Sequence, residues 1–397
     1  MAEQRSFLGK LMLVASGIAI ALVIAEVGLR LLIPRPNFYV YDSNNGWMPA
    51  PGAAGVDNDE GEAWLAINNE GFRGPPVAYD KPPGTVRIVV LGDSFTEAQQ
   101  VPMEDTFSAV MQRQLANCPA FKGRKVEVLN LGVDGYGTAQ ELIQMRRRAF
   151  RFHPDYVVLA FFAGNDVRNN SIRLEGDKCR PFFVYRSGVL ELGGPFDDSE
   201  LFRLQCMARF ESRHLRVIDT IGGARSAIRD WWRNNEKRPS PTMGREPGVS
   251  DLVYRPPADP VWRDAWRVTD GEIAEMYHES ARAGVGFMLV TLSTGIQDYP
   301  DPDVRMRYMR FVGVNDLFYP ERHLKALADQ EGFPILNLAP LMEAWADSNR
   351  VFLHGFKAGR PGTGHWNIIG NHIAGAFIAD KFCEMASAPN FNHYAQK

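Results

Sequence analysis

The sequence predicts an α/β protein in which a central parallel sheet lies between two layers of helices. Runs of β-branched and apolar residues recur along the chain, as in strands that a parallel sheet buries on both faces. Amphipathic segments alternate with these runs, and that order is typical of a three-layer α/β/α sandwich. The expected strands are 87–91, 126–132, 156–162, 285–293 and 334–340. The expected helices are 104–117, 137–150, 270–284, 320–332 and about 370–385.

Each element follows from its own residues. The first strand is apolar from Ile88 to Leu91 and stops at a polar Gly-Asp-Ser tripeptide. The next two strands, "VEVLNLG" and "YVVLAFF", have the same apolar character, and each is preceded by an amphipathic helix. The alternation of strands and helices is lost over about 170–262 and returns with the helix that starts at Asp270. We therefore expect a sheet domain over 86–390 that carries one insertion, most simply a flexible loop, with a lid or a membrane-facing loop as alternatives.

Two segments precede this domain. Residues 35–85 are rich in Asn, Gly and Pro and predict an irregular lead-in. Residues 1–34 predict a membrane anchor, because Leu11–Ile33 is apolar apart from Ser16, Glu26 and Arg30 and is long enough to span a bilayer. Glu26 and Arg30 stand at i,i+4 and can pair on one helical face. A cleaved signal peptide is the alternative, but no small-x-small cleavage site cleanly follows the apolar core, which favours an uncleaved helix.

Composition excludes several classes of protein. The formal net charge is −3, from 44 basic and 47 acidic residues, so no basic excess favours a nucleic-acid partner. The four cysteines, Cys118, Cys179, Cys206 and Cys383, are scattered without a C-x-x-C pair, which argues against a zinc or redox cluster. Three full disulfide pairings are possible; we favour Cys179 with Cys206, since both lie in the insertion, and four free thiols are the alternative.

Three strands end at residues that suit acyl transfer. Ser94 follows the first strand, Gly132 ends the second and Asn165 follows the third. Because the carboxyl ends of parallel strands share one edge, these residues can converge. Acyl transfer needs a nucleophilic oxygen, a base and donors aimed at an oxyanion. Ser94 offers the oxygen, and the backbone N–H groups of Ser94 and Gly132 with the Asn165 amide offer the donors. Alternatively, Ser94 is only the N-cap of the next helix.

Four short blocks together resemble a known family. "GDSFTE", "NLGVDGYGT", "FFAGND" and "GHWN" occur in the order found in SGNH, or GDSL-type, hydrolases. The resemblance covers roughly residues 86–385 apart from the insertion, and it implies a flavodoxin-like sandwich. It also implies that Ser94 is the nucleophile and His365 the base, and that Ser94, Gly132 and Asn165 form the oxyanion hole. The family further implies an esterase-like activity without metal or organic cofactor.

One position departs from the family pattern. An Asp commonly stands three residues before the histidine, but here that position is Gly362, and nothing acidic lies between Val351 and His365. We expect the far nitrogen of His365 to bond instead to a backbone carbonyl of the "GRPGTG" loop or to a carboxylate from elsewhere in the chain. Of the other histidines, His354 could line the site, and His372 is interpreted as structural.

These observations predict a membrane-anchored serine esterase that removes an acyl group, plausibly acetyl, from an envelope carbohydrate or a small ester. The envelope setting of the family predicts a single-pass protein of the cell membrane, with its catalytic domain on the periplasmic side. Two alternatives use the same fold: an O-acyltransferase that acts on an exported polysaccharide, and a glycan-binding module with weak or no catalysis. Gly362 is the residue that favours the last of these.

Overall fold

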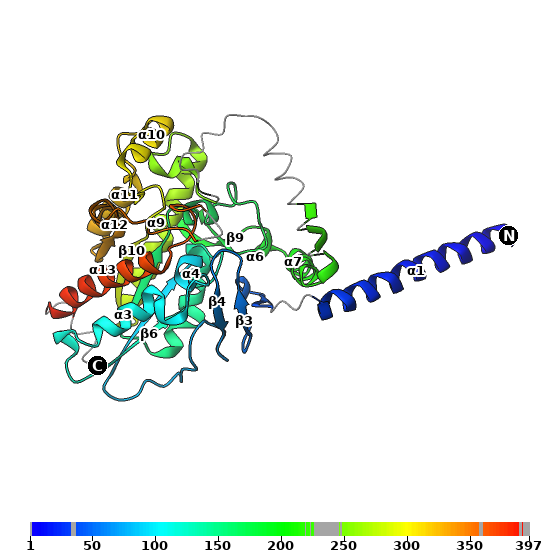
Figure 1. Ribbon diagram of the computed structural model, residues 1–397, viewed down its shortest axis with the longest axis horizontal. Helices are drawn as coiled ribbons and strands as arrows, with labels where there is room; N and C mark the ends of the chain where they lie inside the picture. The colour runs from blue at the N-terminus through cyan, green and yellow to red at the C-terminus, as the bar shows by residue number, and fades with distance from the viewer. Residues whose placement is uncertain are drawn as a thin grey trace. The chain divides into compact units, whose positions relative to one another are not determined.

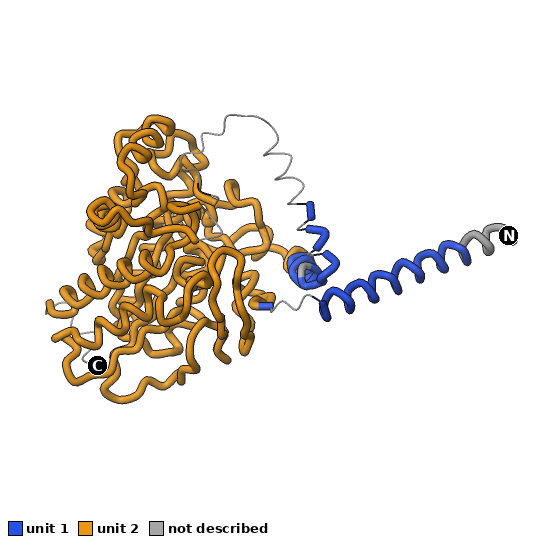
Figure 2. The backbone as a smooth tube through the Cα atoms, in the orientation of Figure 1, with its two compact units in different colours: residues 1–37, 204–241 blue, residues 38–203, 242–397 orange. Residues whose placement is uncertain are grey.

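The computed structural model describes residues 2–32, 37–218, 220–222, 224–225, 246, 248–356, 360–388 and 391. The chain divides into two compact units, one of residues 1–37 and 204–241 and the other of residues 38–203 and 242–397 (Figure 2). The second unit contains the sheet.

Five parallel strands form the central sheet, in the order β11-β10-β7-β5-β6. Figure 1 labels β6 and β10 among them. Numbered along the chain, this is the 2-1-3-4-5 order of flavodoxin-like folds, and it confirms the predicted fold class and all five predicted strands. β5 lies between β6 and β7, so the chain crosses from one side of β5 to the other after β6. The strands are β5 Thr85–Gly92, β6 Lys125–Asn130, β7 Tyr156–Phe161, β10 Gly286–Thr291 and β11 Ile335–Asn337.

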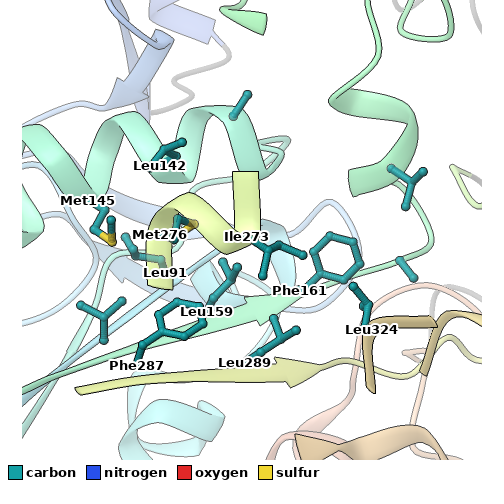
Figure 3. Close-up of a cluster of buried hydrophobic side chains, with 14 of the residues drawn as sticks. Leu91, Leu142, Met145, Leu159, Phe161, Ile273, Met276, Phe287, Leu289 and Leu324 are labelled. Carbon is teal, nitrogen blue, oxygen red and sulfur yellow. The ribbon is translucent and has the colours of Figure 1, made fainter. Parts of the chain in front are cut away.

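Each face of the sheet has its own hydrophobic core. Alternate residues of β5 point to opposite faces, so Val89 and Leu91 enter one core and Ile88 and Val90 the other. Helices cover both faces, which makes the predicted three layers. The first core, part of which Figure 3 shows, involves α4 Thr138–Arg147, α9 Pro260–Arg282, α10 Pro302–Val312 and α11 Tyr319–Glu331. The second involves α3 Phe107–Leu115, α12 Leu338–Asn349 and α13 Ile368–Ser387.

Two helices were not expected from the sequence. α10 begins at Pro302 behind the N-cap Asp301, in a stretch rich in Asp and Pro that does not resemble a helix. α12 follows β11 without a break, because Asn337 ends the strand and caps the helix. α9 also begins earlier than predicted, at Pro260, where Asp259 accepts from two backbone N–H groups.

The lead-in is more regular than predicted. It forms two antiparallel hairpins, β1 Tyr39–Asp42 with β2 Gly46–Pro49 and β3 Ala54–Asp57 with β4 Ala63–Ala66. The buried guanidinium of Arg73 then donates to the carbonyls of Glu97 at 3.0 Å and Val101 at 2.6 Å. The Tyr39 hydroxyl adds a 2.7 Å hydrogen bond to the Glu97 carboxylate. The lead-in is thus held against the segment that follows β5.

The insertion also contains regular structure where it is described. A hairpin of β8 Phe182–Arg186 and β9 Val189–Gly193 is followed by α6 Pro195–Asp198 and α7 Glu200–Arg213. The flexible loop that the sequence predicts is therefore wrong for this part, and residues 226–245 lie outside the described residues. The remaining short elements are α2 Ser94–Glu97, α5 Asp166–Asn169, η1 Met103–Asp105, η2 Pro119–Phe121, η3 Ala149–Phe152 and η4 Asp251–Tyr254.

The cysteines are oxidised. Cys118 and Cys383 form a disulfide that joins the chain after α3 to α13. Cys179 and Cys206 are not free thiols either, so the alternative of four free thiols is wrong.

The N-terminal helix α1 spans Ala2–Leu32. Its Gly9–Leu32 part has a mean hydropathy of 2.3 and is long and apolar enough to cross a membrane, as a signal sequence also is. The predicted pair is present, with Arg30 Nε 2.7 Å from Glu26 Oε1. The Glu26 carboxylate also accepts from the backbone N–H groups of Arg216 and Val217, each at 3.0 Å.

Candidate active site

Ser94 lies at the carboxyl end of strand β5, as the first residue of α2. The cap of that helix is Asp93, whose carboxylate accepts from Phe95 N at 2.9 Å. The alternative role of Ser94 as an N-cap is therefore wrong, and its hydroxyl is not used to satisfy the helix. As the first residue of the helix, Ser94 also has a backbone N–H without an intrahelical partner.

His365 is brought to Ser94 by the loop before α13. Its Nε2 lies 2.8 Å from Ser94 Oγ, which is hydrogen-bond distance for a nucleophile and its base. The ring also packs on Phe95, with ring centroids 4.8 Å apart. The structure therefore joins the two residues that are 271 positions apart in the sequence.

A glutamate from the lead-in occupies the other side of His365. Glu60 lies between β3 and β4, and its Oε2 bonds to His365 Nδ1. The carboxylate comes close because residue 364 is a glycine: a Cβ at Gly364 would lie 2.0 Å from Glu60 Oε1. Of the two acceptors proposed for the far nitrogen of His365, the carboxylate from elsewhere in the chain is the one that the structure contains.

Gly362 has a structural reason to lack a side chain. Its φ is +79°, in the left-handed region that favours glycine, and a Cβ there would lie 2.5 Å from a ring carbon of Tyr299. An aspartate at this position would meet both the strained backbone and the Tyr299 ring. The loop therefore excludes the acid of the family pattern from its usual place.

The contact with Glu60 changes both pKa values. Burial lowers the pKa of His365, but the hydrogen bond and charge of Glu60 outweigh it and raise the pKa above the ordinary 6.5. Burial raises the pKa of Glu60, and the contact with His365 holds that pKa below its ordinary value. The pair is thus arranged to stabilise an imidazolium on His365.

Asn165 follows β7 and lies near the same strand ends. Its Nδ2 donates to Asp93 Oδ2 at 3.3 Å, which orients the amide next to the residue that precedes Ser94. Desolvation of Asp93, which is fully buried, raises its pKa to about 6. One amide hydrogen of Asn165 is used by Asp93, and the second leaves a donor for an oxyanion.

Gly132 packs closely against α2. A Cβ at this position would lie 2.3 Å from the backbone nitrogen of Glu97, so only glycine fits. Its own N–H donates to Asn130 Oδ1 at 2.9 Å. The structure therefore brings Gly132 to the helix that carries Ser94, while its role as an oxyanion donor stays a prediction.

His354 does not line the site. It is fully buried behind the loop that carries His365, where it bonds to Asp298 and to the carbonyl of Gly364. His372 lies on α13 and pairs with Asp105 at 2.8 Å, away from Ser94.

A cavity of about 340 Å³ opens beside His365. It is bordered by carboxylates and amides with no apolar side chain; besides Gly364 and His365, its walls are Asp57, Asp59, Glu60, Gln99, Gln100 and Asp134. In the described part of the chain, this cavity included, no group of three or more His, Cys, Asp or Glu side chains is arranged to hold a metal ion.

Sequence reasoning missed Glu60. It lies in the acidic stretch "DNDEGE" within a segment that was expected to be irregular, and no catalytic spacing relates it to Ser94 or His365. Its only signal was indirect: the histidine loop lacked an acid, so one was needed from another part of the chain.

The strand order defines an α/β/α sandwich, and Ser94 and His365 lie at the distance that a serine nucleophile and its base require. The family model of GDSL-like lipase/acylhydrolases matches residues 88–183. Together with the four sequence blocks, this match supports an SGNH/GDSL hydrolase, and that family consists of carboxylic ester hydrolases. No curated protein matches the chain.

Several solved structures overlap most of the chain at low identity. An acetyl xylan esterase, AlAXEase, is 14% identical, with 75% of this chain and 98% of that chain covered and a TM-score of 0.37. The lipase/acylhydrolase from Enterococcus faecalis is 13% identical, with coverages of 75% and 96% and a TM-score of 0.36. A lipolytic protein of the G-D-S-L family from Veillonella parvula DSM 2008 is 13% identical, with coverages of 75% and 98% and a TM-score of 0.34.

Proposed function

We propose that the protein is a serine esterase that removes a short acyl group from an oxygen ester through an acyl-Ser94 intermediate. The observation that carries this proposal is the continuous contact from Ser94 Oγ to His365 Nε2 and from His365 Nδ1 to Glu60. The three side chains are arranged as in a Ser-His-acid triad. The members of such a triad are recognised by their geometry and not by their positions in the chain.

In the first half of the reaction, Ser94 Oγ attacks the ester carbonyl while His365 Nε2 takes its proton. Glu60 accepts the Nδ1–H bond, which fixes the tautomer and stabilises the imidazolium. The Ser94 N–H and the Asn165 amide would donate to the tetrahedral oxyanion. The Gly132 N–H, expected from the sequence as a third donor, would join them only by sharing or giving up its bond to Asn130 Oδ1. His365 then returns the proton to the departing alcohol. Water, activated by His365 in the same way, releases the acid and restores Ser94.

The cavity beside His365 supports a polar substrate. Its walls of carboxylates and amides offer hydrogen-bond acceptors to hydroxyl groups, and none of the side chains that line it is an apolar one that would pack against a long hydrocarbon chain. We infer a small acyl group, such as acetyl, on a hydroxyl-rich alcohol such as a carbohydrate. An O-acyltransferase would follow the same steps up to the acyl-enzyme and differ in passing the group to a sugar hydroxyl instead of water.

We further propose that α1 anchors the protein in the cell membrane, with the sheet domain on the extracytoplasmic side. The apolar stretch Gly9–Leu32 supports the anchor. The Cys118–Cys383 disulfide supports the side, because structural disulfides form in oxidising compartments such as the periplasm.

The test compares the wild-type protein with Ser94→Ala on acetyl and octanoyl esters of one chromogenic alcohol. We expect turnover of the acetyl ester, a loss of at least about 10³-fold in kcat in the variant, and labelling of Ser94 alone by a serine-directed phosphonate. Ser280→Ala, which changes a fully buried serine outside the site, is the control and should keep its activity.

Two results would contradict the proposal: undiminished activity in Ser94→Ala, or phosphonate on a different serine. Faster turnover of the octanoyl ester would overturn the short-acyl assignment alone. Acetyl transfer to an added oligosaccharide in preference to water would identify an acyltransferase.

A further inference from the structure

A buried histidine lies behind the loop that carries His365. His354 has no exposed surface; its Nδ1 is 2.6 Å from the carbonyl oxygen of Gly364, and its Nε2 is 3.2 Å from Asp298 Oδ2. Both partners can only accept a hydrogen bond, so each ring nitrogen of His354 must donate one. The contacts therefore describe a His354 imidazolium that is paired with a buried Asp298 carboxylate and that holds the residue before His365.

The same carboxylate also reaches the residue after His365. The indole Nε1 of Trp366 donates to Ser293 Oγ at 3.1 Å, and Ser293 Oγ donates to Asp298 Oδ2 at 2.7 Å. Gly364 and Trp366, the two chain neighbours of His365, are thus tied to one oxygen of Asp298 through His354 and Ser293 respectively. The backbone adds a bond from Gly355 N to the His365 carbonyl at 3.0 Å.

We propose that Asp298 and His354 are positioning residues for His365, forming a clamp that holds both of its chain neighbours and so aims its Nε2 at Ser94. The proposal rests on the proposed function. Neither side chain takes part in the proton transfers described above, so both act through the loop. A small displacement of a catalytic group can cost about 10²-fold in rate, which is the effect that such a clamp prevents.

The buried charges of Asp298 and His354 suit a role in orienting the loop through hydrogen bonds better than a role in stabilising the fold. Asp298 is 1% exposed and His354 is 0% exposed, so both ions are removed from water. A buried ion pair gives little net stability compared with apolar side chains of similar volume, because desolvation offsets the attraction. What apolar side chains cannot supply is the set of directed bonds to the Gly364 carbonyl and to the Ser293 hydroxyl.

Three variants of the full-length protein separate positioning from stability. Asp298→Ala removes the common anchor, and we expect kcat to fall about 10- to 100-fold with KM nearly unchanged. In Asp298→Asn the amide nitrogen, placed where Oδ2 was, can donate one hydrogen to a neutral His354 and the other to Ser293 Oγ, so we expect most of the activity to be retained. Ser293→Ala cuts only the link to Trp366 and should lower kcat by a smaller factor while the protein stays folded.

The control is Asp155→Asn. Asp155 is another buried carboxylate, at the opposite end of β7, where it accepts from Arg87 N at 2.7 Å. The Asp155→Asn substitution should lower the melting temperature of the protein without changing kcat. The clamp is overturned if Asp298→Ala and Ser293→Ala both have a lower melting temperature but the wild-type kcat. If Asp298→Ala does not fold, a wild-type kcat in Ser293→Ala overturns the clamp.

A second measurement does not depend on esterase activity. The pKa of His365, followed by NMR of the histidine side chains, should fall in Asp298→Ala because the ring loses its fixed contact with Glu60. An inactive wild-type protein would overturn the proposed function, and an unchanged His365 pKa in the variant would overturn the clamp.

Discussion

At the residue scale, the protonation of His365 decides when the enzyme can work. His365 must be neutral to take the proton of Ser94, so it acts as a base only above its pKa. Glu60 raises that pKa above 6.5 despite burial, and the lower pH limit of activity should therefore lie above 6.5. The imidazolium that forms during attack is stabilised by the same carboxylate.

Replacing Glu60 by Gln should move this limit. Without the carboxylate, the pKa of His365 falls, so the acid limb of kcat/KM against pH shifts to lower pH. At the optimum, kcat should drop by about 10²-fold or more, since the imidazolium loses its counter-charge. Asp59→Gln, which changes an exposed carboxylate in the wall of the same cavity, controls for local charge. If the acid limb of kcat/KM lies at the same pH in Glu60→Gln as in the wild type, Glu60 does not act on His365.

Restoring the acid of the family pattern should harm the enzyme. Gly362→Asp forces a side chain into a left-handed backbone and against Tyr299, at a cost of about 1–3 kcal/mol in the free energy of unfolding. We expect a lower melting temperature and a lower kcat. Gly52→Asp has a similar φ of +77° but no atom within 4 Å of the added Cβ, so it isolates the backbone cost. A gain in kcat for Gly362→Asp would contradict this reading of the loop.

At the scale of elements, the sheet was predictable and the triad acid was not. Every sheet strand lies within an apolar run that can be recognised, including the three-residue β11, which lies within "PILNLAP". The residues at the strand ends follow from the parallel order. The hairpin strands of the lead-in are only four residues long and lie among Asn, Gly and Pro, so their pattern is too short to stand out. Glu60 reaches His365 only through tertiary packing of that hairpin, which no local pattern encodes.

The disulfide joins two elements of the second core. Cys383 of α13 pairs with Cys118, which lies between α3 and η2, across 265 residues. The double variant Cys118→Ser/Cys383→Ser should unfold with a free energy about 3–5 kcal/mol lower, measured in denaturant. Because full reduction also affects Cys179 and Cys206, fully reduced wild type should match the fully reduced variant. Equal stability of oxidised wild type and variant would contradict a structural role for this bond.

At the scale of the whole molecule, the anchor and the disulfide make a joint prediction about topology. Protease added to intact spheroplasts should digest the sheet domain, whereas a cytoplasmic domain would be protected. The N-terminal residue of the purified protein distinguishes an uncleaved anchor from a signal sequence, because only the anchor keeps residues 1–34. Full protection in spheroplasts would reverse the proposed orientation.

In the proposed mechanism, the position of Glu60 gives this chain its own order of catalytic residues. The acid is followed by the nucleophile and then by the base, whereas the family pattern has the acid beside the base near the C-terminus. A protein fragment cloned from the first sheet strand onward would contain Ser94, His365 and every strand of the sheet, yet it would lack the carboxylate. Genome surveys that search for an acid next to the histidine would likewise sort this chain with the pseudoenzymes. The lead-in should therefore be counted as part of the catalytic unit whenever its boundaries are drawn.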